Sequence, residues 1–226
     1  ITTRLVGSEM CIRDRFRQLY KYDISETDAH NPQEALEQAE KRASNIYGTV
    51  YTHFLTNGST SGIIAAVLSC VKQGDKVLIW ENAHPCHENA VKLAGAIPVY
   101  YNLPFSKEWG VPCKTTSELI DVKGVKAVIV TSPTYEGIVS DIKELKEVCE
   151  KNGAYLIVDE AHGALYPFSK DLPQSAVSIA DFTIQSLHKT AGGLNPTALL
   201  HVNCKLSAKK ALSIINTTSP SYPILA

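Results

Sequence analysis

The chain has 226 residues, of which 44% are hydrophobic and 20% charged, enough for one large domain or two small ones with a sizeable buried core. A formal net charge of −1 argues against a nucleic-acid or anionic-membrane partner, and the longest apolar run, residues 62–71, is too short to span a bilayer. The six cysteines show no CxxC pair and no zinc-like spacing, so we expect free thiols, no metal site and a reducing, cytoplasmic location.

The N-terminal segment, residues 1–15, contains the only methionine and follows neither a helical nor a strand period. We interpret it as a non-native, adaptor-like segment and leave it out of the fold prediction. At its other end the chain stops on apolar residues without a polar tail. We therefore expect residues 16–226 to form one large domain that is truncated at both ends.

The first predicted helix covers residues 32–47, because Asn31 suits its N-cap, Pro32 its first position and Gly48 its exit. Further helical patterns cover 60–72, 86–94, 141–151 and 207–215. They alternate with apolar runs that predict strands at 51–55, 76–80, 97–101, 125–131, 155–159, 182–185 and 198–202.

This alternation predicts an α/β fold, with a mostly parallel seven-stranded sheet and helices on both of its faces. The last two strands are joined by a loop without a helix, so we expect them to pair in antiparallel fashion. In open α/β sheets, ligands bind at the carboxyl ends of the strands. Four of these ends carry chemically active side chains.

The first of these ends reads TNGSTSG and leads directly into an apolar helix. Gly58 permits an unusual backbone angle, and Ser59 or Thr60 can cap the helix, whose free amides and dipole suit a phosphate. An ordinary capped helix is the alternative, and no lysine follows to make a Walker loop. The second end offers His84 and His87, which are either polar surface residues or rings that stack on a flat ligand.

The fifth strand ends in LIVDEAHGA. Asp159 follows four apolar residues, so its carboxylate lies at the edge of the core and requires a cation. Glu160 is expected to point to the opposite face and to be solvated. His162 lies within reach of the same cavity as Asp159.

The sixth strand leads into QSLHKTAGG, with Ser186, His188 and Lys189. A lysine at the end of a buried strand must be paired or neutralised, and a desolvated neutral lysine is a nucleophile suited to a Schiff base. A surface lysine is the alternative. The four ends together supply a phosphate cradle, a stacking ring, a carboxylate and an amine, which is the set that pyridoxal 5'-phosphate requires.

From about residue 20 to its end, the chain resembles one enzyme family in the order and spacing of several strings. They include FLTNGSTSGI, GDKVLIWENAH, TSPTYEGIVSDI, LIVDEAHGA, QSLHKT and TALLHV. The family is that of the bacterial Orn/Lys/Arg decarboxylases. The resemblance implies a pyridoxal-phosphate-binding large catalytic domain of fold type I, with the aspartate-aminotransferase-like fold.

The resemblance also implies a role for each site residue. Lys189 would hold the cofactor as a Schiff base, Asp159 would pair with the ring nitrogen, and His162 would reach the phenolic oxygen. His84 would stack on the pyridine ring, with Ala161 on its other face. The phosphate would be bound by Ser59, Thr60, Ser61, Ser186 and His188.

The function that follows is decarboxylation of arginine, lysine or ornithine to agmatine or a diamine, in a homodimer or higher homo-oligomer of the full-length protein. Alternatives of the same fold are an α-oxoamine synthase, a cysteine desulfurase and an aminotransferase. A folded, non-catalytic remnant is an alternative of a different class. Pro85, Cys86 and the 191–198 stretch AGGLNPTA depart from the family pattern, and we expect them to alter phosphate or partner-subunit contacts.

Overall fold

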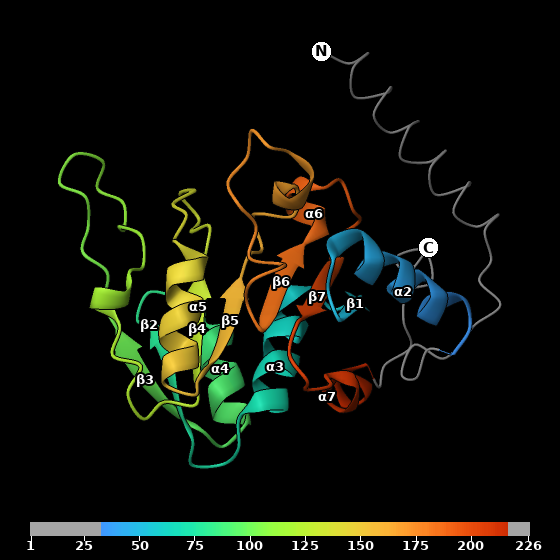
Figure 1. Cartoon of the computed structure of the whole chain (residues 1–226), viewed down its shortest axis with the longest axis horizontal. Coiled ribbons are helices and arrows are strands. Elements are labelled where there is room, and N and C mark those ends of the chain that lie inside the picture. The colour runs from blue at the N-terminus through green and yellow to red at the C-terminus, as the bar shows by residue number, and fades with distance from the viewer. Residues whose placement is uncertain (1–32, 217–226) are drawn as a thin grey trace, which may run out of the picture.

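A mixed sheet of seven strands runs through residues 33–216, the part of the chain that this computed structural model describes (Figure 1). The order of the strands across the sheet is β1-β7-β6-β5-β4-β2-β3, and the predicted fold class is confirmed. The strands are β1 (Tyr51–Leu55), β2 (Lys76–Trp80), β3 (Ile97–Tyr101), β4 (Ala127–Thr131), β5 (Tyr155–Asp159), β6 (Phe182–Ser186) and β7 (Ala198–Val202).

Strand direction decides which ends of the strands meet. Strands β2, β3, β4, β5 and β6 are parallel, whereas β7 is antiparallel to both of its neighbours, β6 and β1. Two reversals restore the direction, so β1 points the same way as the parallel strands. The antiparallel pairing of the last two strands was predicted, but the position of β1 beside β7 was not.

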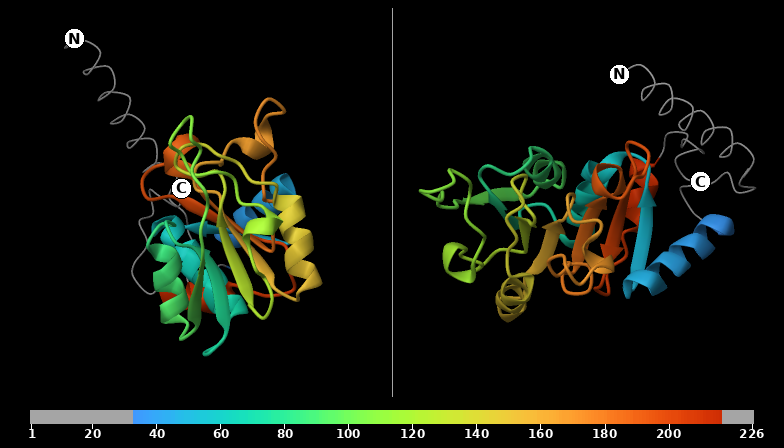
Figure 2. Two further views of the ribbon diagram at one scale, coloured as in Figure 1. Left: turned by 90° about the vertical axis from the view of Figure 1, so that its left-hand side faces the viewer. Right: turned by 90° about the horizontal axis from the view of Figure 1, so that it is seen from above.

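Helices cover both faces of the sheet (Figure 2). Helices α3, α4 and α7 contribute to one core cluster, while α5 contributes to the other cluster on the opposite face. Ile157 belongs to the first cluster and its neighbours Leu156 and Val158 to the second, so β5 is buried on both sides. The helices are α2 (Ala35–Tyr47), α3 (Gly58–Cys70), α4 (Cys86–Leu93), α5 (Ile142–Lys151), α6 (Leu187–Thr190) and α7 (Lys209–Ile215). None of the helices in residues 33–216 is both long and apolar enough to cross a membrane.

Most predicted helix ends are close to the observed ones. The Asp141 side chain accepts the Glu144 amide at 3.1 Å and caps α5, and Gly48 ends α2 with φ 67°. The predicted cap of the first helix, Asn31 with Pro32, lies outside the described residues, as does the 1–15 segment, and α2 begins at Ala35.

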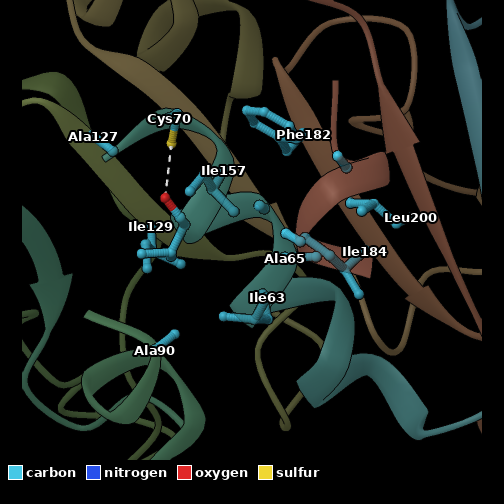
Figure 3. Packing of buried hydrophobic residues seen from close by; sticks show 14 of the residues in the cluster. Ile63, Ala65, Cys70, Ala90, Ala127, Ile129, Ile157, Phe182, Ile184 and Leu200 are labelled. Atoms are coloured by element: carbon cyan, nitrogen blue, oxygen red, sulfur yellow. Dashed lines mark hydrogen bonds between the residues drawn. The ribbon is translucent and has the colours of Figure 1, made fainter. Parts of the chain in front are cut away.

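Helix α3 is the central helix of the larger core cluster. Its side chains Ile63 and Ala65 pack among Ile157 and Ile184 of the sheet (Figure 3). This packing favours glycine at position 62, where an added Cβ would lie 2.7 Å from Leu55 Cδ1 and 3.0 Å from Ile184 Cγ2. The contact fixes the distance of α3 from β1 and β6.

We predict that Gly62→Ala destabilises the protein, although alanine is the better helix former by about 1 kcal/mol. Leu55 and Ile184 are buried and cannot move aside without cost, and overpacking of this kind costs about 1–3 kcal/mol. We expect a net loss of about 1 kcal/mol, measured as the free energy of unfolding in urea. In a Leu55→Val background, which lacks the clashing methyl, the same substitution should cost less. Equal costs in both backgrounds would contradict this account.

Candidate active site

A cavity of about 640 Å³ opens where the carboxyl ends of the strands meet, within the size range of small-molecule sites. Residues that follow β1, β2, β4, β5 and β6 line it. It brings together most of the predicted site residues, namely Ser59, Thr60, His84, Asp159, Ala161, His162, His188 and Lys189. It also includes Gly58, Asn195 and Pro196, for which we predicted an effect on the site but no direct binding role. The further lining residues, which were not predicted, are Asn57, Thr131, Pro133 and Tyr135.

The start of α3 forms one wall of the cavity. Gly58 has φ 76°, which favours glycine, and its amide donates to the Pro196 carbonyl at 2.8 Å. The following amides of Ser59 and Thr60 lie in the first helical turn, which offers no carbonyl partner, and the helix dipole there attracts an anion. Ser61 differs from the prediction, because its buried hydroxyl donates to the Gly58 carbonyl at 2.6 Å and does not line the cavity.

The Asp159 carboxylate lies at the end of β5 and is only 7% exposed. His87 Nε2 lies 2.9 Å from its Oδ2, and the Ala161 amide donates to its Oδ1 at 3.2 Å. Burial alone would raise the pKa of Asp159, but the hydrogen bond from His87, the Ala161 amide and the nearby Lys189 bring it below its usual value. A carboxylate therefore faces the cavity in its ionised form.

His87 is the residue whose position the sequence analysis left open. It is fully buried on α4, and the polar-surface alternative is wrong. The signal was present in the helix itself, because Cys86, His87, Ala90 and Val91 recur at helical spacing and form the buried side of α4.

Lys189 lies in the same cavity as Asp159, but it is exposed, so the expectation of a desolvated lysine is wrong. The chain turns into the short helix α6 directly after β6, and this turn carries Lys189 beyond the buried strand end. Its Nζ lies 3.1 Å from His162 Nε2. Burial and the Lys189 charge lower the pKa of His162, so His162 is a neutral acceptor for this ammonium.

The remaining predicted residues divide into two groups. The exposed His84 lines the cavity, and its ring is held by the Cys86 amide, which donates to Nδ1 at 3.2 Å. His188 also lines the cavity and donates from Nδ1 to the Thr197 carbonyl at 2.8 Å. Ser186 is buried outside the lining, and its hydroxyl has no partner among the described residues.

Three of the departures from the family pattern, Cys86, Asn195 and Pro196, lie next to the start of α3. Asn195 and Pro196 line the cavity, and Pro196 holds the Gly58 amide. Cys86 is buried and hydrogen-bonds the Thr60 side chain, and burial raises the pKa of its thiol to about 12. The expectation that these residues alter phosphate or partner-subunit contacts stays a prediction.

Comparison with known proteins assigns residues 17–226 to a family model described as Orn/Lys/Arg decarboxylase, major domain. The chain is 34% identical to the uncharacterized protein YaaO of Bacillus subtilis strain 168, over 93% of this chain and 47% of that protein. It is 32% identical to an arginine decarboxylase of Halalkalibacterium halodurans, over 88% of this chain and 43% of that protein. The chain thus spans about half the length of these relatives.

Solved structures give the same fold at lower identity. A lysine decarboxylase of Francisella novicida superposes with a TM-score of 0.73 and 21% identity, over 85% of this chain and 30% of that one. An aspartate aminotransferase of Thermotoga maritima superposes with a TM-score of 0.69 and 21% identity, over 95% of this chain and 60% of that one.

Behind the cavity, Glu160 begins a buried polar network. Strand alternation turns it away from the cavity lining as predicted, but it is buried, so the expectation of a solvated side chain is wrong. Its carboxylate accepts hydrogen bonds at 2.6–2.7 Å from Ser175 Oγ, the Ala176 amide and Gln185 Nε2. Gln185 Oε1 lies 3.2 Å from His201 Nε2, so the network continues to β7.

We predict that Glu160→Gln changes how the stability of the protein depends on pH. Burial raises the pKa of Glu160 to about 7 from an unfolded value of 4.5. Protonated Glu160 therefore contributes fully to the free energy of unfolding below pH 4.5, and this contribution is lost as the pH rises through 7. Glutamine does not titrate, so the free energy of unfolding of the variant does not fall in this way as the pH rises. Its destabilisation relative to the original protein should therefore be larger at pH 5 than at pH 8, by up to about 3 kcal/mol.

The measurement is urea unfolding at a series of pH values. Glu147→Gln is a matched control, because Glu147 is 69% exposed and should show no such trend. A destabilisation that grows with rising pH would contradict the prediction, because it would mean that the three hydrogen-bond donors lower the pKa of Glu160 by more than burial raises it.

Proposed function

The chain belongs to the Orn/Lys/Arg decarboxylase family, and on this premise we propose that the intact protein removes the α-carboxyl group of a basic amino acid with pyridoxal phosphate bound in the cavity. The observation that carries the proposal is the meeting of three groups in one cavity: the start of α3, the Asp159 carboxylate and the Lys189 amine. They suit, in turn, a phosphate, a ring cation and a carbonyl carbon.

The residues present fit this cofactor. The cavity is large enough for a cofactor together with an amino acid. The first turn of α3 offers amides to an anion, and the buried Thr131 hydroxyl in the lining has no partner among the described residues. Asp159 has both oxygens held from the protein side, which leaves its ionised carboxylate in position for a cation.

The proposed binding roles follow from these positions. Ser59 and Thr60 would bind the phosphate together with His188, which lines the same cavity. His84 would lie against the ring, because the Cys86 amide already fixes the orientation of its imidazole. Asp159 would hold a proton on the ring nitrogen. Ala161, on the Asp159 side of the cavity, is small enough to pack against a flat ring.

Bound pyridoxal phosphate supplies a carbonyl for the substrate amine and a protonated ring that withdraws electrons from the breaking bond to the carboxyl group. Lys189 would anchor the carbonyl carbon through Nζ and later hold a proton there for the substrate Cα. His162 lies 3.1 Å from the same nitrogen as a neutral hydrogen-bond acceptor, so it would orient the Lys189 amine toward the carbonyl carbon.

The substrate class rests on the family description and on the relatives named arginine decarboxylase. Lysine and ornithine differ by one methylene, which a pocket distinguishes by only about 1–3 kcal/mol. The assay therefore requires arginine, lysine and ornithine in parallel. Agmatine, cadaverine or putrescine identifies the substrate.

We predict that Lys189→Ala abolishes both cofactor attachment and amine production, with a loss of activity of at least about 10³-fold, because the amine that binds the carbonyl is gone. The measurements are the absorption band of the bound cofactor near the visible edge and the amine product. Reduction with borohydride before digestion should leave the cofactor attached to the peptide that carries Lys189 in the original protein.

Lys170→Ala is a matched control, since Lys170 is exposed and lies outside the cavity lining. It should keep the band and the activity. Release of a keto acid or of alanine in place of an amine would reject decarboxylation in favour of another reaction of this fold. A protein that binds the cofactor through a residue other than Lys189 would refute the proposed anchor.

A further inference from the structure

We propose that His87 is a positioning residue, which holds the Asp159 carboxylate ionised and turned toward the cavity and thereby sets the acid limit of cofactor binding. The inference rests on the proposed function and adds a residue to its site. His87 does not line the cavity, so it acts only through Asp159.

The pair joins two elements that are distant in the sequence. His87 comes from the first turn of α4, Asp159 from the last position of β5, and 72 residues separate them. Their contact of 2.9 Å lies between side chains that are 1% and 9% exposed. Because an ionised carboxylate can only accept, His87 Nε2 carries the proton of this hydrogen bond.

No other polar contact explains why a histidine is buried here. Its second nitrogen, Nδ1, has no hydrogen-bond partner among the described residues. The neighbours on the same side of α4, Ala90 and Val91, are apolar and fully buried. An apolar side chain would satisfy the packing of this position better than an imidazole, so the contact with Asp159 is what the histidine provides.

Other ionisable groups around Asp159 cannot replace it. Lys189 and His162 approach from the cavity side, where the ligand must bind, and Lys189 would be consumed in anchoring it. Cys86 is close, but burial keeps its thiol protonated. The protein side of Asp159 is thus held by His87 and by the Ala161 amide alone among the described residues.

Removal of His87 therefore has a defined consequence. Asp159 keeps its burial, which favours the protonated acid, and loses one of its two donors. A protonated Asp159 cannot pair with the ring cation. The affinity for the cofactor should then fall as the pH is lowered, over a range in which the original protein still binds fully.

The experiment compares His87→Leu with His87→Gln and the original protein. Leucine keeps an apolar volume among Ala90 and Val91, and glutamine returns an N–H donor toward Asp159. Pyridoxal phosphate affinity is measured by absorbance between pH 5.5 and 8.5. For His87→Leu we expect affinity about tenfold lower or more at pH 6, as expected for one hydrogen bond to a charged group, and a smaller deficit at pH 8.5.

His87→Gln should recover most of the affinity and show the flatter pH profile of the original protein. All three proteins contain Lys189, His162 and Cys86, so the difference between Leu and Gln isolates the donor. A uniform loss at every pH that glutamine does not rescue would overturn the proposal and leave His87 a packing residue, and so would unchanged binding by His87→Leu.

Metal analysis of the purified protein adds a separate check, since ligand atoms of Cys86, His87 and Asp159 lie within 4.8 Å of one another. A stoichiometric metal that is lost in His87→Leu would overturn the proposal, because a cation would then hold Asp159. Failure of the proposed function looks different: the original protein would itself show no cofactor band that depends on Lys189.

Discussion

The buried carboxylate of Asp159 is the constraint around which the site is organised. It ends β5, a central strand that is covered on both faces, and an ionised carboxylate there is costly unless donors and a cation surround it. His87 and the Ala161 amide meet part of this requirement from the protein side. Lys189 adds a positive charge from the cavity side, and in the proposed function a ring cation would add another.

The direction of one strand brings the rest of the site to this carboxylate. Because β7 runs opposite to both β6 and β1, the end of β1 lies at the same edge as the ends of β4, β5 and β6. Helix α3 starts from that end, and Gly62 sets how closely it packs on β1 and β6. The Pro196 carbonyl then ties the loop after Lys189 to the first amide of α3. The wall that carries Lys189 and the wall formed by the start of α3 are therefore parts of one packed unit.

Local patterns were sufficient to predict the strands, most helix ends and the strand-end residues, because periodicity, caps and parallel topology are properties of short segments. Pairwise packing was not predictable in this way. The burial of His87 depends on which helix side meets the sheet, and the exposure of Lys189 depends on the turn into α6. Tyr135 was missed because the loop after β4 was not treated as a strand end with chemistry, and Asn195 was predicted only as part of the 191–198 stretch, without a place in the cavity.

Asp159 and Glu160 show that the charge of the neighbouring groups, and not the number of hydrogen bonds, decides whether the pKa of a buried carboxylate is lowered or raised. Glu160 accepts three hydrogen bonds from uncharged donors, yet burial raises its pKa to about 7. Asp159 has His87 and Lys189 beside it, and its pKa is lowered. The pKa values of these adjacent carboxylates therefore shift in opposite directions, because His87 and Lys189 lie beside Asp159 and not beside Glu160. The ionised carboxylate of Asp159 therefore lies on the cavity side, and Glu160 is a structural acceptor in the buried network behind it.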